Sequence, residues 1–261
     1  MNNIVLDFFG FSQLPFSKNV SPKNVFEPQS YKEAFARLGF GVSNEDILLI
    51  TGPIGCGKSV ILKSFISSLD SNQHSPVYLP SANISDGELY KAILAGLKIE
   101  PPHFAAAAKR LYFKSIPDRT KKPVVVIDDA QELTDSALIG IKSMVNFDFD
   151  SLNKITFILA GEPELKERLG YSQFLSLKQR IRVSFEMYGM SLEETCRYID
   201  HHTSICGRPS SIFADDAKSE IYKRSSGMPR TINSICYKSI LYAATNEIKI
   251  IDSLNLDPDD F

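Results

Sequence analysis

Two kinds of apolar pattern alternate along the first two thirds of the chain. Short continuous apolar runs predict strands over 46–51, 77–79, 124–129 and 155–161, the last two of which are expected to be buried on both faces. Between these runs, apolar residues at helical spacing predict helices over 31–40, 60–66, 85–97, 105–115 and 137–144. Strands that alternate with helices in this way indicate an α/β doubly wound sheet.

The last third of the chain shows mainly helical patterns. Ser191 and Glu194 form a capping box that begins one helix. Further helices are predicted over 215–225 and 231–245, with a short strand at 248–250. These elements predict a small all-helical domain.

Residues 1–32 combine proline, asparagine, serine and aromatic residues with little periodicity. This composition predicts an ordered loop segment packed on the main domain. The sequence therefore predicts three parts: the segment 1–32, an α/β domain over 33–187 and a helical domain over 188–261. The acidic residues 257–261 are expected to fray.

A phosphate-binding pattern lies between the first predicted strand and the helix that follows it. Residues Gly52 to Ser59 fit G-x-x-x-x-G-K-[ST] at every fixed position. A strand that turns into a helix N-terminus offers backbone N–H groups and a positive dipole end to an anion. Lys58 is expected to reach the β- and γ-phosphates of ATP, and the Ser59 hydroxyl to ligate Mg²⁺. The residues expected to bind the nucleotide are Gly52, Pro53, Ile54, Gly55, Cys56, Gly57, Lys58, Ser59 and Val60.

Two acids follow the third predicted strand. Asp128 and Asp129 end an apolar run, where ligands bind in open α/β sheets. Asp128 is expected to hold Mg²⁺ through water, and Asp129 to polarise the water that attacks the nucleotide. Aromatic residues of 1–32 are expected to anchor that segment; alternatively, some of them line an adenine pocket.

Composition limits the other classes of protein. The formal net charge is −2, so nucleic-acid contacts would need a local basic patch. The 4 cysteines form no C-x-x-C pair, which argues against zinc and disulfides and suits a reducing cytosol. No apolar run reaches the roughly 20 residues of a membrane helix, and no signal peptide is evident. The adjacent His201 and His202 are expected to be surface residues and not metal ligands.

Taken together, the chain resembles the AAA+ ATPases, and more narrowly the ExeA-like ATPases and the transposon-encoded ATPases of the TnsC/TniB and MuB kind. The resemblance covers nearly the whole chain. It is carried by Phe9-Gly10 with Pro15-Phe16, Gly52–Ser59, Asp128–Gln131, Leu159–Leu165, Gln179–Ile181 and Gly227–Arg230.

The resemblance implies further roles. Arg180 would be an arginine finger acting on ATP in a neighbouring subunit, with Arg182 as a competing candidate. Arg230 would be a sensor arginine of the helical lid that contacts the γ-phosphate in cis, and Gly161-Glu162 would lie beside the nucleotide. Such positive charges neutralise the γ-phosphoryl oxygens.

Two positions differ from the family's usual pattern. The family usually has Asp-Glu where this chain has Asp128-Asp129, and commonly Gln where it has Glu162. Because aspartate is one methylene shorter than glutamate, we expect slow basal hydrolysis that depends on a partner.

The resemblance also implies a function in DNA transposition. ATP-bound subunits would form a ring or helical filament on double-stranded DNA and recruit a transposase. A local basic block would face the DNA backbone or, alternatively, form an ordinary solvated face: Lys109, Arg110, Lys114, Arg119, Lys121 and Lys122. The residues expected to contact DNA are Lys91, Lys98, Lys109, Arg110, Lys114 and Lys121.

The alternative is a secretion-pathway ATPase that remodels an envelope assembly. That function would normally need a membrane anchor, and the sequence shows none, so the transposition function is preferred at this stage. A small-molecule kinase is disfavoured because it would leave the helical lid and the candidate trans arginine unexplained.

Overall fold

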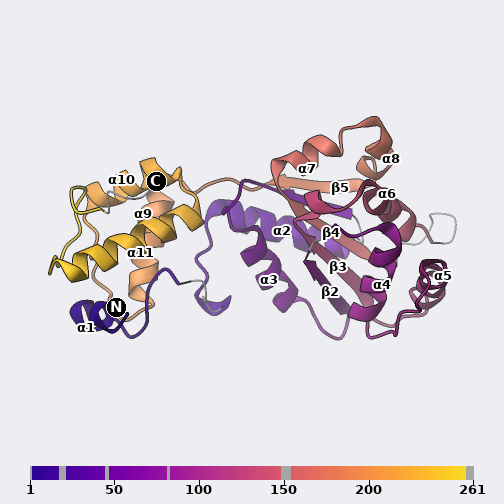
Figure 1. Cartoon of the computed structure of the whole chain (residues 1–261), viewed down its shortest axis with the longest axis horizontal. Helices are drawn as coiled ribbons and strands as arrows, with labels where there is room; N and C mark the ends of the chain where they lie inside the picture. The colour runs from indigo at the N-terminus through magenta and orange to yellow at the C-terminus, as the bar shows by residue number, and fades with distance from the viewer. Residues whose placement is uncertain (1, 18–21, 45–46, 81–82, 148–153, 257–261) are drawn as a thin grey trace. The chain divides into compact units, whose positions relative to one another are not determined.

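The computed structural model describes residues 2–17, 22–44, 47–80, 83–147 and 154–256, and these form two compact units (Figure 1). The first unit comprises Glu33–Ile54 and Lys58–Met187 and contains the sheet. The second comprises Met1–Lys32, Gly55–Gly57 and Tyr188–Phe261 and is helical. The predicted fraying of 257–261 lies outside the described residues.

The first unit is built on a parallel sheet of 5 strands in the order β2-β3-β4-β1-β5. The strands are β1 (Ile47–Thr51), β2 (His74–Pro80), β3 (Lys122–Asp128), β4 (Thr156–Gly161) and β5 (Ile181–Glu186). The residues of β1 and β4 are buried throughout, as expected for central strands covered on both faces. The predicted doubly wound α/β fold is confirmed.

Helices cover both faces of this sheet (Figure 1). On one face, α4 (Asp86–Gly96), α5 (Ala105–Ser115) and α6 (Asp135–Met144) share a hydrophobic core with the strands. On the other face, α2 (Gln29–Ser43) approaches β1 so closely that a Cβ on Gly41 would lie 2.3 Å from the Leu48 side chain. The aromatic rings of Phe35 and Phe65 join α2 to α3 (Lys58–Ser68), with centroids 5.4 Å apart.

One strand and several short helices are absent from the sequence prediction. Along β5, the buried Val183 and Phe185 alternate with exposed residues, as on an edge strand with one covered face. This alternation spans only 6 residues and includes charged side chains. From the sequence alone, the segment therefore resembles a polar loop more than a strand. The short helices α7 (Pro163–Arg168), η4 (Ser172–Phe174) and α8 (Leu175–Lys178) connect β4 to β5.

The second unit packs α1 (Asn2–Phe9), α9 (Leu192–Ser204), α10 (Asp215–Ser225) and α11 (Pro229–Thr245), with the short helix η1 (Pro22–Asn24). The capping box is present at the start of α9, where the Ser191 side chain accepts from the Glu194 N–H at 3.2 Å. The predicted strand at 248–250 is wrong. That segment is irregular, and only an isolated bridge between Phe213 and Ile251 forms next to it.

The N-terminal segment differs from its prediction as a loop on the α/β domain. It contains α1, and its side chains Val5, Phe9 and Phe16 join the hydrophobic core of the helical unit. The Arg208 guanidinium donates to the Phe9 carbonyl at 2.8 Å, and Ser12 N–H donates to the Cys206 carbonyl at 2.8 Å. The aromatic residues therefore serve as hydrophobic anchors, but they anchor the segment to the helical unit.

The prediction that both histidines lie on the surface is wrong for His202. Its side chain is 3% exposed, and its ring stacks on Phe16 with centroids 5.1 Å apart. Burial lowers the pKa of His202 to about 4. His201 is half-buried, with Nε2 2.8 Å from the Asn24 carbonyl. Across the described residues, His, Cys, Asp and Glu side chains form no metal-binding group of three or more.

Candidate functional site

The carboxyl ends of the strands meet at one edge of the sheet. In the parallel register, Thr51 of β1 pairs with Gly161 of β4 and with Glu186 of β5. Pro80 of β2 likewise pairs with Asp128 of β3. Because β4 lies between β1 and β3, its end separates the phosphate-binding pattern from the two acids.

The phosphate-binding pattern forms a loop that leads into α3. Gly55 (φ +82°) and Gly57 (φ +105°) adopt left-handed backbone conformations that favour glycine. Lys58 is the first residue of α3, and its Nζ donates to the carbonyls of Gly52 at 2.7 Å and Pro53 at 3.1 Å. Its side chain lies against the loop and is largely buried.

The remaining residues of this pattern differ in exposure. Ser59 and Val60 are exposed in the first turn of α3, and Ile54 is exposed within the loop. Cys56 is buried. The first turn of α3 thus has an exposed serine directly after Lys58.

Asp128 ends β3 in a polar environment. Asp128 is 4% exposed, and its carboxylate accepts from the Asp129 N–H at 3.1 Å and from the Tyr78 hydroxyl at 3.1 Å. Burial, together with the charge of Asp128, raises the pKa of Tyr78 to about 12. The Tyr78 hydroxyl is therefore a protonated donor at neutral pH. Tyr78 was predicted only as a strand residue.

Asp129 is exposed and adopts a left-handed conformation, with φ +53° and ψ 42°. Aspartate tolerates this region better than most residues. One carboxylate oxygen accepts from Gln131 Nε2 at 3.3 Å. The left-handed turn thus ends the strand abruptly and presents a second carboxylate beside the first.

The end of β4 contacts both the phosphate-binding loop and the turn Asp128–Gln131, which we call the acidic turn. Gly52 N–H donates to the Gly161 carbonyl at 3.2 Å, and Glu162 N–H donates to Gln131 Oε1 at 3.1 Å. Glu162 is the N-cap residue of α7, but its side chain makes no capping hydrogen bond. Gly52 at the start of the loop, the end of β4 and the acidic turn are thereby linked by hydrogen bonds within the sheet-containing unit.

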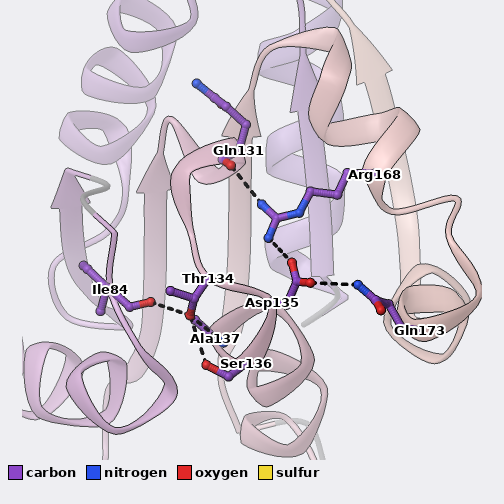
Figure 2. A network of polar contacts seen from close by, with 8 residues as sticks. All are labelled: Ile84, Gln131, Thr134, Asp135, Ser136, Ala137, Arg168 and Gln173. Atoms are coloured by element: carbon purple, nitrogen blue, oxygen red, sulfur yellow. Dashed lines mark hydrogen bonds and ion pairs between the residues drawn. The ribbon is translucent and has the colours of Figure 1, made fainter.

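Figure 2 shows a polar network that holds the backbone at Gln131. Arg168 Nη1 donates to the Gln131 carbonyl at 2.8 Å, and its Nη2 pairs with the Asp135 carboxylate. Gln173 donates to the other Asp135 oxygen at 2.8 Å. Arg168 and Gln173 have no role in the sequence prediction, because they come from α7 and η4, two elements that the sequence patterns did not reveal.

The arginines for which the sequence predicts a role in hydrolysis lie away from this edge or in the helical unit. Arg180 precedes β5, and the pairing of Ile47 with Ile181 places it at the amino end of the strands, roughly 15 Å along β1 from the phosphate-binding loop. Arg182 is exposed on β5. Arg230 is the exposed second residue of α11 in the helical unit.

The turn before Arg230 is tightly built. Gly227 has φ +72°, its carbonyl accepts from Met190 N–H at 2.9 Å, and an added Cβ would lie 2.0 Å from the Met190 carbonyl oxygen. Only glycine fits this close approach.

A pocket of about 580 Å³ opens in the same unit, lined by residues that include Tyr188, Arg197 and Tyr222.

The predicted DNA-binding residues lie on α4, after it, on α5 and in the loop that follows. Lys109, Arg110 and Lys114 are exposed on α5, and Lys98 and Lys121 are exposed outside the helices. Lys91 is half-buried, and its ammonium donates to the His103 carbonyl. Lys91 is therefore the least suited of the six to contact a phosphate backbone.

The oxygen groups at the sheet edge fit Mg²⁺ with a nucleotide. Hydroxyl and carboxylate oxygens are the hard ligands that Mg²⁺ prefers, and the ion is usually held by one or two protein groups together with substrate phosphates. Ser59 and Asp128 carry oxygen groups of this kind and could hold the ion.

Comparisons with known proteins agree with this geometry. Residues 42–169 match the model of the family described as AAA domain. The chain is 27% identical over 244 residues to the general secretion pathway protein A of Aeromonas hydrophila; the match covers 90% of this chain and 44% of that relative. The chain thus spans less than half the length of this relative.

Solved structures show the same fold at low sequence identity. Cdc6p from Pyrobaculum aerophilum is similar with a TM-score of 0.72 at 17% identity, covering 90% of this chain and 67% of that one. The Aeropyrum pernix ORC1 protein in complex with DNA gives 0.66 at 12% identity, covering 89% and 64%. The RuvB Holliday junction branch migration motor of Thermotoga maritima gives 0.60 at 19% identity, covering 87% and 66%. The sheet-containing unit therefore has the P-loop NTPase fold, and residues 42–169 of the chain are similar to the AAA-domain family.

Proposed function

We propose that this chain is an ATPase that binds ATP with Mg²⁺ at the carboxyl edge of its sheet and hydrolyses it slowly. The observation that carries the proposal is the placement of the phosphate-binding loop and of Asp128 and Asp129 at one edge, joined through the end of β4. Phosphoryl transfer depends mainly on positioning and charge neutralisation, which such an edge can supply.

The proposed binding step uses the loop and the start of α3. The backbone N–H groups and Lys58 would hold the phosphates, with Lys58 Nζ exchanging its carbonyl partners Gly52 and Pro53 for phosphate oxygens. Ser59 and Asp128 would hold Mg²⁺, which when bound neutralises charge on the β- and γ-phosphates.

The proposed hydrolytic step uses Asp129. Its exposed carboxylate would orient the attacking water and accept a proton from it, and its short side chain would keep the basal rate low. Arg180 would act on ATP of a neighbouring subunit, which its place at the amino end of the strands favours over action within one subunit. Arg230 of the helical unit would contact the γ-phosphate in cis. We keep 33–187 as the ATPase domain and 188–261 as its lid.

For the work that ATP drives, we propose ATP-dependent assembly on double-stranded DNA to recruit a transposase. Exposed basic residues on α5 support DNA binding. Of the structural neighbours, the Aeropyrum pernix ORC1 protein was solved in complex with DNA, and RuvB is described as a Holliday junction branch migration motor. The similarity to a general secretion pathway protein favours the second candidate, an ATPase of an envelope assembly. No helix in the described residues is both long and apolar enough to cross a bilayer.

The ATPase proposal is tested by phosphate release and by binding of a fluorescent ATP analogue. Lys58→Ala should abolish binding, whereas Lys63→Ala, which removes an exposed lysine from the same helix, should bind as the wild type does. If Lys58→Ala bound the analogue with unchanged affinity, the proposed site would be wrong.

Fluorescence anisotropy with duplex DNA at low salt distinguishes the DNA-assembly function from the secretion candidate. ATP-dependent binding that weakens steeply between roughly 50 and 200 mM salt supports the DNA function. The double variant Lys109→Glu, Lys114→Glu should weaken it, with Lys63→Glu as the control. Absence of wild-type binding at low salt would instead favour the secretion candidate.

A further inference from the structure

Within the described residues, Gln131 makes three hydrogen bonds at the candidate site, two through its side-chain amide and one through its backbone carbonyl. The proposed roles above do not use this residue. Its side chain bridges two strand ends: Nε2 donates to the Asp129 carboxylate at 3.3 Å, and Oε1 accepts from the Glu162 N–H at 3.1 Å. An amide can do this because it carries a donor and an acceptor on one planar group.

The space for this amide is built into β4. A Cβ on Gly161 would lie 2.6 Å from Gln131 Oε1 and 2.8 Å from the Leu165 side chain. The absence of a side chain at Gly161 therefore lets the amide lie directly against the strand end. The same glycine accepts from Gly52 N–H of the phosphate-binding loop at 3.2 Å, so the amide and the loop contact opposite sides of one short segment.

The backbone that carries Gln131 is also held in place. Arg168 donates to the Gln131 carbonyl at 2.8 Å and pairs with Asp135 (Figure 2). Three residues after Gln131, the Thr134 hydroxyl donates to the Ile84 carbonyl at 2.9 Å and accepts from Ala137 N–H at 3.2 Å. The turn is thus anchored on both sides, and the direction of the Gln131 side chain is set by fixed groups.

We propose that Gln131 is a positioning residue for the hydrolytic step. Through the end of β4, it holds the Asp129 carboxylate at a fixed position relative to the phosphate-binding loop. The proposal rests on the proposed ATPase function. Asp129 is exposed and lacks the reach of glutamate, so without a partner its carboxylate would rotate freely. A displacement of about 1 Å can reduce a catalysed rate about 100-fold.

Two substitutions at Gln131 separate the two hydrogen bonds of its amide. Gln131→Met keeps the length of the side chain and removes both bonds. Gln131→Glu keeps an acceptor for Glu162 N–H but replaces the donor to Asp129 with a like charge. We expect both variants to lower kcat at least tenfold while the affinity for a fluorescent ATP analogue stays within twofold.

The matched control is Gln173→Met. Gln173 belongs to the same network, but it donates to the Asp135 oxygen that does not pair with Arg168. This variant should keep kcat within twofold. Gly161→Ala serves as a second test, because the added methyl group should displace the Gln131 amide without removing it, and kcat should fall as in Gln131→Met.

Hydrogen exchange gives a readout that does not depend on turnover. In the nucleotide-free protein, the Glu162 amide should exchange faster in Gln131→Met than in the wild type, and Gln131→Glu should retain its protection. Turnover of Gln131→Glu within twofold of wild type would overturn the proposal, as would an equal loss of kcat in Gln173→Met. If the wild type itself released no phosphate from ATP, the proposed function would fail, whereas a working wild type with unaffected Gln131 variants would fail this inference alone.

Discussion

At the scale of single residues, the site combines a carboxylate that is fixed with one that is exposed. Asp128 is buried and has two hydrogen-bond donors, whereas Asp129 is exposed in a left-handed turn. The sequence was sufficient to predict which two acids end β3. It could not predict Tyr78 or Gln131 as their partners, because those contacts depend on how three strand ends are aligned.

The backbone of Asp129 decides which variants test its role cleanly. Asp129→Asn keeps a residue that tolerates positive φ, whereas Asp129→Ala should lose about 1 kcal/mol of folding free energy from backbone strain. We expect Asp129→Asn to bind ATP normally and to release almost no phosphate. Chemical denaturation together with phosphate release measures both effects. Glu132→Gln, an exposed acid three residues away, is the control, and normal turnover in Asp129→Asn would show that another group positions the water.

His202 should make stability depend on pH. Its pKa is lowered to about 4 by burial, below the value of about 6.5 in an unfolded chain. As pH falls from 6.5 towards 4, His202 is protonated in the unfolded state but stays neutral in the folded state. The free energy of unfolding therefore decreases. At pH 5 this loss is about 2 kcal/mol relative to pH 7.

Urea unfolding at both pH values measures the effect. His202→Phe, which keeps a ring against Phe16, should remove most of the difference between pH 7 and pH 5. His201→Phe should retain it. An equal pH dependence in His202→Phe and the wild type would contradict this assignment.

At the scale of elements, local signals predicted most of the fold. The helices α4 and α9 begin at capping boxes, and α5 and α10 have the bounds that their sequence patterns predict. Where local signals were weak, tertiary packing decided the structure. The edge strand β5 mixes buried and charged residues, and α1 buries Val5 and Phe9 in a core formed with helices that are distant in the sequence.

The capping box of α9 should contribute to the stability of the helical unit. Glu194 accepts from its own cap residue Ser191 at 3.0 Å and from Gln29 N–H at 2.7 Å, so it joins the N-terminal segment to α9. Glu194→Ala should lower the free energy of unfolding by about 1 kcal/mol, and Glu193→Ala, which removes a solvent-exposed neighbour, by much less. Equal losses measured by urea unfolding would show that the box contributes nothing beyond charge.

At the scale of the whole molecule, the proposed function uses an arginine that lies far from the phosphate-binding loop in the same sheet. Arg180 lies at the end of the strands opposite the phosphate-binding loop. Within the proposed function, this placement makes hydrolysis a property of assembled subunits. Sequence motifs suggested this organisation, but the identity of the partner that ATP controls depends on surfaces that carry no comparable motif.

Assembly should therefore appear in the concentration dependence of turnover. Phosphate release per subunit should rise with protein concentration in the wild type and stay at the low, dilute value in Arg180→Ala. Arg182→Ala, on the exposed face of β5, should follow the wild type. If Arg180→Ala reduced turnover equally at the lowest and highest concentrations, a role across subunits would be excluded.

The most direct measurement of the central claim is a crystal structure of the chain grown with Mg²⁺ and a non-hydrolysable ATP analogue. We expect the triphosphate to lie in the loop Gly52–Ser59, with Lys58 on its phosphates and Mg²⁺ between Ser59 and Asp128. Density for the analogue at any other place, or crystals that exclude it at saturating concentration, would contradict the account.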